Sequence, residues 1–170
     1  DDVYAITYNN AKNYKVVYTS LKNPDWNNSK TVAAEKADET IEGITYCKDY
    51  MFITYSDGIN NFISKYNFNT KKTTEIKLPF SGTASIYSFD TKTNNCIAGI
   101  TSWNKPYTEF MYNAETDAFS PSSFNKPVVY PAAYQNIEVE EVQAKGEDGT
   151  MIPLSIIHKK GIKMDGSNVC

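Results

Sequence analysis

The sequence predicts an all-β fold, because short apolar runs alternate with turn residues along almost the whole chain. Within these runs the apolar residues alternate with polar ones or form short clusters, as they do in half-buried strands. No segment has an apolar stripe at helical spacing, and the one helix-like stretch, residues 33–39, is too short to be stable alone. Aromatic residues make up 14% of the chain, which excludes a disordered segment.

The strands follow one another at the short spacing of a sandwich, barrel or propeller. Turn residues separate them, for example Asn9-Asn10 and Asp57-Gly58, which favour tight reversals. Strands are expected at residues 3–8, 14–21, 31–35, 40–47, 50–56, 61–68, 73–78, 85–90, 96–103 and 109–113, with a weaker one at 118–124.

An internal repeat favours the propeller. The segment YNFNT at residues 66–70 returns as YNAET at residues 112–116, an offset of 46 positions, and Ser56 falls on Ser102 at the same offset. A period of this length with four strands inside it is the size of a propeller blade. We therefore expect a partial blade at about residues 1–37 and full blades at about 38–80 and 81–127. Together they form about two and a half four-stranded blades of an incomplete β-propeller.

A second unit is expected after the blades. Two alternating runs, residues 137–142 and 151–157, flank a loop that contains Asp148-Gly149, which indicates a β-hairpin. A lone hairpin is marginal in water, so these strands predict the start of another domain. Prolines 127 and 131 predict an extended, stiff connection. The expected organisation is blades at 1–129, a linker at 130–136 and a truncated second domain at 137–170.

The segment EDGTMIPLSIIHKKGIKMDGSN at residues 147–168 resembles the entry into the peptidase domain of the prolyl oligopeptidase family of serine peptidases. In that family a seven-bladed propeller covers an α/β-hydrolase domain, and a hairpin of this kind follows the last blade. The resemblance implies that residues 1–129 are the C-terminal blades and that residues 137–170 hold the N-terminal hairpin of the hydrolase. It also implies a serine-type endopeptidase that hydrolyses short peptides, with propeller blades that tilt as a body to control access.

No catalytic residue is assigned to this chain. An α/β-hydrolase nucleophile needs G-x-S-x-G, whereas residues 82–86 and 99–103 place the serine one position late and lack the second glycine. His158, the only histidine, precedes every position at which the family's triad residues lie, and it is interpreted as a strand residue. The glycine-rich stretch that bears the family's oxyanion-hole tyrosine would follow Asn168. The piece alone is therefore expected to be inactive.

No cofactor or metal site is assigned either. Cys47, Cys96 and Cys170 are far apart in the sequence and are expected to be free thiols, and a zinc site would need more ligands at closer spacing. Glu138 and Glu140 share a strand face. They are interpreted as solvated charges on a strand edge and not as ligands of a cation.

Four further features are considered. Glu141, Glu147 and Asp148 extend the acidic run around the hairpin and are interpreted in the same way as Glu138 and Glu140. Residues 145–146 lack the pattern of a phosphate loop. The segment at residues 27–29 matches a glycosylation acceptor, a motif that is common by chance. Trp26 and Trp103 are interpreted as structural, with ligand stacking on a loop as the alternative.

The charge balance excludes nucleic acid as a partner. Lysine supplies all 17 basic residues against 20 acidic ones, which leaves a net charge of −3 and no arginine. No apolar run approaches a membrane span, and the first residues have neither the basic start nor the apolar centre of a signal peptide. A cytoplasmic location is expected, with a periplasmic or secreted one left open.

The expected partners are short peptide substrates, the remainder of the propeller and the hydrolase domain. Two alternatives to this function stay open. One is a non-enzymatic β-propeller that binds a peptide or protein. The other is a peptidase similar to oligopeptidase B, which prefers basic residues.

Overall fold

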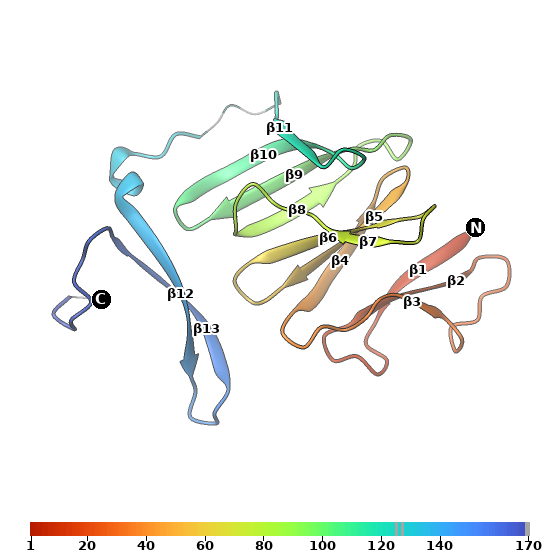
Figure 1. Cartoon of the computed structure of the whole chain (residues 1–170), viewed down its shortest axis with the longest axis horizontal. Coiled ribbons are helices and arrows are strands. Elements are labelled where there is room, and N and C mark those ends of the chain that lie inside the picture. The colour runs from red at the N-terminus through yellow and green to blue at the C-terminus, as the bar shows by residue number, and fades with distance from the viewer. Residues whose placement is uncertain (125, 127, 169–170) are drawn as a thin grey trace.

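A computed structural model describes residues 1–124, 126 and 128–168. It is built from β-strands, with one short 3-10 helix, and so confirms the all-β prediction (Figure 1). The first sheet holds β1 (Asp2–Thr7), β2 (Lys15–Ser20) and β3 (Lys30–Ala33). The second holds β4 (Thr40–Tyr46), β5 (Tyr50–Ser56), β6 (Asn61–Asn67) and β7 (Thr73–Glu75). The third holds β8 (Thr83–Tyr87), β9 (Asn95–Ser102), β10 (Lys105–Asn113) and β11 (Ala118–Pro121).

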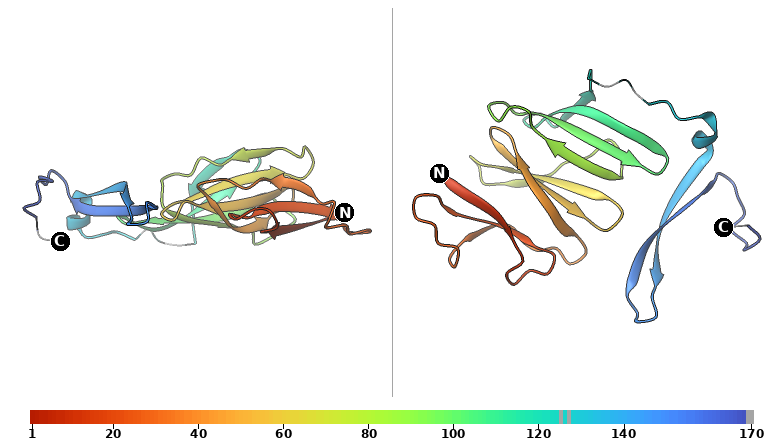
Figure 2. Two further views of the ribbon diagram at one scale, coloured as in Figure 1. Left: turned by 90° about the horizontal axis from the view of Figure 1, so that it is seen from below. Right: turned by 180° about the vertical axis from the view of Figure 1, so that it is seen from behind.

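Each sheet is an antiparallel meander in which consecutive strands are neighbours. We call the sheets the first, second and third blades; they have three, four and four strands, close to the predicted two and a half blades. They lie side by side as an open fan (Figure 1 and Figure 2). Strand β4 contacts β1 of the first blade and β8 of the third, so the first strands of neighbouring blades lie next to each other.

Two apolar clusters join the blades. The cluster between the first and second blades contains Val16, Ala33, Ile41, Met51, Ile53, Tyr55 and Tyr66. The cluster between the second and third blades contains Cys47, Phe52, Ile63, Ile76, Ala84, Ile86, Cys96, Ala98, Ile100, Tyr112 and Ala114. Residues of β5 contribute to both clusters, because neighbouring side chains of a strand point to opposite faces. The second blade is therefore covered on both sides.

The sequence repeat corresponds to the same turn in two blades. Asn67 ends β6, and its Oδ1 atom accepts hydrogen bonds from the backbone N–H groups of Asn69 and Thr70. Asn113 ends β10, and its Oδ1 atom accepts hydrogen bonds from the backbone N–H groups of Glu115 and Thr116. Such asparagine turns replace backbone hydrogen bonds with local side-chain ones. The 46-residue offset is thus a structural repeat.

The connection to the last strands differs from the prediction. Residues Ala132–Asn136 form a 3-10 helix, η1, in place of extended chain, and the N–H of Tyr134 donates to the carbonyl of Pro131 at 2.9 Å. Pro131 has a φ of −52°, which suits the residue before a helix as well as an extended strand. Pro127 lies outside the described residues.

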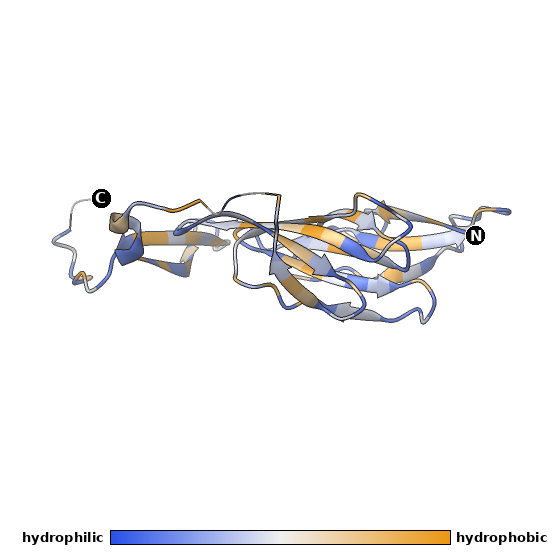
Figure 3. Cartoon of the chain, turned by 90° about the horizontal axis from the view of Figure 1, so that it is seen from above, coloured by the Kyte–Doolittle hydropathy of each residue, from blue (hydrophilic) through white to orange (hydrophobic). Residues whose placement is uncertain are grey.

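The hairpin forms as predicted. Strand β12 (Ile137–Lys145) pairs with β13 (Met151–Lys159) in a continuous antiparallel register. Gly149 has a φ of +84° in the connecting loop, a conformation that glycine adopts without strain. Apolar segments, orange in Figure 3, alternate with polar ones in the strands of the blades and in this hairpin. Large apolar side chains of the hairpin are exposed to solvent: Met151, Ile152, Leu154 and Ile157 are each about half exposed. The described part of the chain contains no helix with the length and apolarity needed to cross a bilayer.

Candidate functional site

A cleft of about 860 Å³ lies where the blade ends face the hairpin. Three connections between strands form one wall: the β5–β6 turn, the β7–β8 segment and the β9–β10 turn. Hairpin residues Val139, Glu141, Pro153, Leu154 and Ser155 form the other wall. The hairpin lies beside the ends of the blades in Figure 1. The cleft therefore lies between the two parts that the sequence assigned to different domains.

The β5–β6 turn holds the hairpin in place. The Oδ1 atom of Asp57 accepts hydrogen bonds from the N–H groups of Ile59 and Asn60, at 2.9 and 2.7 Å. The turn orients the Asn60 side chain, whose Nδ2 atom donates to Oε2 of Glu141 on β12 at 2.8 Å. Asn60 is 7% exposed, so this bond is shielded from water on the blade side. It is a polar anchor between blade and hairpin.

The β7–β8 segment packs closely against the third blade. The carbonyl of Gly82 accepts a hydrogen bond from the N–H of Asn61, and Asn61 Oδ1 accepts one from the N–H of Ala84, both at 2.9 Å. Gly82 has a φ of +155°, and a Cβ atom there would collide with the backbone carbonyl of Thr101. Only glycine fits at this position without displacing the backbone. The wall of the cleft is thus continuous from the second blade to the third.

The β9–β10 turn contributes an aromatic ring and a cation to the cleft. Trp103 is 60% exposed there. The Nζ atom of Lys105 lies 4.5 Å from the ring centroid of Phe80, within the range of a cation–π contact. The sequence interpreted Trp103 as structural, with ligand stacking as the alternative, and the structure places it on the wall of the cleft. An exposed aromatic ring and a cation on an open wall are groups that can contact a peptide.

The cleft has no catalytic pair among the described residues. Serines 81, 102 and 155 line it, but a serine nucleophile needs a neighbouring base. His158 lies on β13 and its side chain contacts Glu140 at 3.1 Å and the carbonyl of Lys159 at 3.0 Å. These acceptors, the carbonyl first, raise the pKa of His158. Both ring nitrogens are thus engaged within the hairpin, and His158 is not among the residues that line the cleft.

The acidic residues of the hairpin fall on different sides. Glu138 and Glu140 are exposed on one face, as the alternation predicted, and only Glu141 reaches the blades. Glu147 is exposed, and Asp148 Oδ1 accepts a hydrogen bond from the N–H of Thr150 within the hairpin loop. Across the described residues no group of three or more histidine, cysteine, aspartate and glutamate side chains is arranged to hold a metal ion.

The remaining candidates lie away from the cleft. Lys145 ends β12 and the loop continues with Gly146, whose N–H donates to the carbonyl of Thr150. Asn27 is exposed in the β2–β3 connection, where its N–H donates to Asp25. Trp26 in the same connection is 47% exposed.

Two cysteines meet at the opposite end of the blades. Cys47 and Cys96 are free, almost fully buried thiols, and they lie within hydrogen-bonding reach of each other. The sequence did not predict this proximity. The hydrogen bond from Cys96 lowers the pKa of the Cys47 thiol, and the same bond, together with burial, raises the pKa of Cys96. Cys170 lies outside the described residues.

Comparison with known proteins gives consistent results. Residues 1–125 match the model of the prolyl oligopeptidase N-terminal β-propeller domain. A prolyl endopeptidase of Elizabethkingia meningoseptica is 34% identical over 168 residues, and one of Elizabethkingia miricola is 32% identical. Each match covers 99% of this chain and 23% of the relative, so the chain spans about a quarter of these enzymes.

Solved structures of similar proteins have the same fold. One, from a study of inter-domain dynamics in two prolyl endopeptidases, superposes with a TM-score of 0.84 at 19% identity and covers 96% of this chain and 24% of that one. Prolyl oligopeptidase B of Galerina marginata, bound to a 35-residue substrate, superposes with a TM-score of 0.80 at 26% identity. That match covers 97% of this chain and 23% of the fungal one. The superpositions include the hairpin as well as the blades, since they cover nearly the whole chain.

Proposed function

Because the chain belongs to the prolyl oligopeptidase family, we propose that it is the propeller end and the first peptidase-domain hairpin of a serine-type prolyl endopeptidase. Residues 1–129 supply the C-terminal blades, residues 130–136 the linker, and residues 137–170 the N-terminal hairpin of an α/β-hydrolase domain. The whole enzyme hydrolyses short peptides. The described residues carry no member of its catalytic triad.

The anchored cleft carries this proposal. Asn60 of the second blade binds Glu141 of the hairpin, so the propeller is attached directly to the first element of the peptidase domain. Three blade connections and the hairpin enclose a volume of about 860 Å³ beside this bond. A peptide that moves from the propeller toward the hydrolase would pass along such a wall in extended form.

The blades act in this proposal by excluding large substrates. The apolar clusters between neighbouring blades make the blades a stiff body, whereas the junction with the hairpin includes the polar anchor from Asn60 to Glu141 beside an open cleft. A stiff body on a narrow junction tilts more readily than it deforms. Short peptides would enter when the blades tilt, and a folded protein would be too large.

The test uses the longer protein that contains this chain. We expect it to cleave a short chromogenic proline peptide, and to leave the same sequence uncut when it is placed in a surface loop of a folded protein. The 1–170 chain alone should show no turnover. If the 1–170 chain hydrolysed the peptide and a serine-directed inhibitor blocked that activity, the proposal that the catalytic residues lie outside residues 1–170 would be wrong.

The same assay separates the alternatives. A longer protein that prefers lysine or arginine over proline at the cleaved bond would support the relationship to oligopeptidase B. Failure to cleave either peptide, with retained peptide binding, would favour a non-enzymatic propeller.

A further inference from the structure

Cys47 and Cys96 belong to different blades. Cys47 directly follows β4 of the second blade, and Cys96 lies on β9 of the third. Both belong to the apolar cluster between these blades, with exposures of 1% and 0%. The pair therefore spans the interface on which the packing of the two blades depends.

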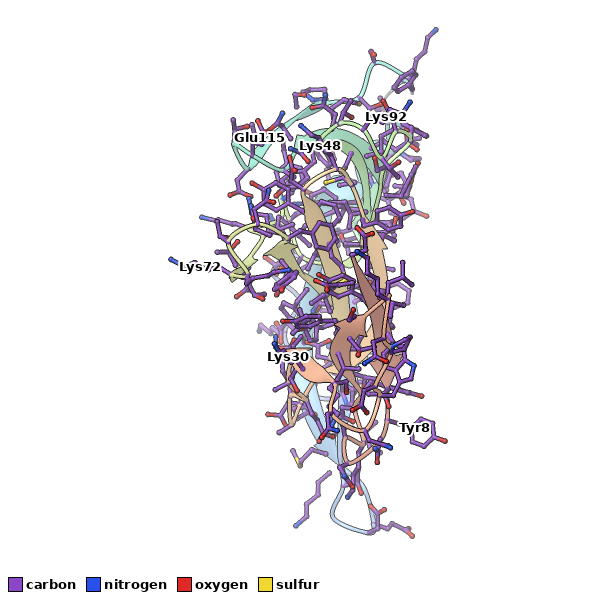
Figure 4. All side chains as sticks on the ribbon, turned by 90° about the vertical axis from the view of Figure 1, so that its right-hand side faces the viewer. Tyr8, Lys30, Lys48, Lys72, Lys92 and Glu115 are labelled. Atoms are coloured by element: carbon purple, nitrogen blue, oxygen red, sulfur yellow. The ribbon has the colours of Figure 1, made fainter. Side chains whose placement is uncertain are left out.

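Hydrogen bonds independent of the thiols hold the two segments together. The N–H of Lys48 donates to the carbonyl of Thr93 at 3.0 Å, and the N–H of Asp49 donates to Oδ1 of Asn94 at 3.0 Å. The two residues that follow Cys47 are thus tied to the turn that leads into Cys96. In Figure 4, Lys48 lies beside Lys92 and Glu115 at one end of the blades, which agrees with this arrangement.

The same asparagine organises the thiols. The Cys47 sulfur donates to Asn94 Oδ1 at 3.4 Å, and the Nδ2 atom of Asn94 is held by Asp49 and Glu115, each at 2.8 Å. The amide is fixed from both sides, so its oxygen points steadily toward Cys47. Among the described residues only this pair of cysteines occurs; both are free thiols, and neither belongs to a cluster of side chains that could hold a metal ion.

We propose that Cys47 and Cys96 form a reversible disulfide that joins the second and third blades when the chain meets hydrogen peroxide. The Cys47 thiolate attacks one peroxide oxygen, the O–O bond breaks, and the departing hydroxide takes a proton to become water. The sulfur of Cys96 then attacks the sulfenic acid at Cys47 and expels its hydroxyl group, which leaves as water with the Cys96 proton. Two thiols and one peroxide thus give one disulfide and two waters.

The surroundings of the pair suit this chemistry. A hydrogen-bonded pair loses its first proton more readily than an isolated buried thiol, because the second thiol stabilises the thiolate. Peroxide is about the size of water and reaches the pair when the turn at residues 47–49 opens briefly. Both side chains lie in one apolar cluster, and the bonds from Lys48 and Asp49 hold their two segments together, so the second step is intramolecular.

The test uses the 1–170 chain with Cys170→Ser, which leaves two thiols. One equivalent of hydrogen peroxide under native conditions should remove both thiols and give one linked pair of tryptic peptides, lighter by two hydrogens and restored by dithiothreitol. The bond should form at least about tenfold faster than in urea, because unfolding separates the sulfurs. The thermal midpoint of the oxidised chain should rise by about 5 °C, and dithiothreitol should reverse the rise.

Single variants Cys47→Ala and Cys96→Ala are the matched controls, and each should give a sulfenic acid or an unreacted thiol without the linked peptides. Absence of the linkage in the Cys170→Ser chain would overturn the proposal. Linkage at the same rate in urea, or an unchanged melting midpoint, would also overturn it. None of these outcomes depends on whether the alanine variants fold.

Discussion

The Nζ atom of Lys65 lies 2.8 Å from Oδ1 of Asp117, and this ion pair joins β6 of the second blade to the turn before β11 of the third. The lysine side chain is 8% exposed and the aspartate 55%. Lys65 also donates to the carbonyl of Ala114 at 2.7 Å, and the Tyr112 hydroxyl donates to the same carboxylate at 2.6 Å. Burial, together with Asp117, raises the pKa of Tyr112, so the phenol stays a donor. One carboxylate thus collects two donors from two blades.

Asp117→Asn should lower the free energy of unfolding by about 1 kcal/mol, because it removes the negative charge that faces the buried ammonium of Lys65. The loss is modest because Asp117 itself is half exposed and solvent screens its charge. Asparagine tolerates the left-handed φ of +58° at this position, so the backbone is not strained. Urea unfolding measures the change. Asp38→Asn, at an exposed site, is the control, and equal losses in the two variants would contradict an ion pair that acts across the blades.

Phe52→Ala should cost about 3–5 kcal/mol, because the ring is fully buried between the second and third blades and packs edge-on against Tyr112. Phe89 is 68% exposed, so Phe89→Ala should cost less than about 1 kcal/mol. Chemical denaturation of both variants tests the difference. Similar losses would show that Phe52 is not part of a tight interface.

Gly82→Ala should destabilise the chain by at least about 2 kcal/mol, because the new methyl group would displace the Thr101 carbonyl and distort the wall of the cleft. Gly43→Ala is the matched control. A Cβ atom at Gly43 meets nothing within 4 Å, so that variant should stay within about 0.5 kcal/mol of the parent. Thermal melts of the pair provide the measurement.

His158 should titrate above its ordinary value of 6.5, and Glu140→Gln should lower its pKa, because the carboxylate favours the imidazolium. A raised folded-state pKa stabilises the fold below the unfolded value, and that contribution disappears as the pH rises through the folded value. The chain has one histidine, so its ring protons can be followed by NMR without assignment. A pKa at or below 6.5 in the parent would contradict the contact.

Most of the strand plan could be predicted from local sequence. Alternation and turn residues placed every strand of the three blades to within a few residues, and residues 50–56 coincide with β5. The repeat was informative because it reflects a local rule: Asn67 and Asn113 each close the same turn with their own side chain. The 3-10 helix at Ala132–Asn136 was missed because a proline before a turn and a proline in extended chain have the same φ.

The contacts between elements could not be predicted in the same way. Asn60 and Glu141 meet only because the β5–β6 turn and the hairpin are brought together by the packing of whole sheets. The same holds for Cys47 and Cys96, whose distance in sequence argued against a pair. Their proximity depends on how one blade is rotated against the next, which no short pattern encodes. The cleft could therefore not be predicted from the sequence, although the breaks between strands that line it could.

Because side chains of β5 alternate between two apolar clusters, the second blade loses contact with its neighbours on both faces only when the entire assembly comes apart. Its amide protons should consequently be the last to exchange with deuterated solvent, at a rate that reports global opening, whereas those of β12 and β13 should exchange through local fraying. The second blade would then be the slowest-exchanging part of the molecule, and the hairpin would open without unfolding the blades.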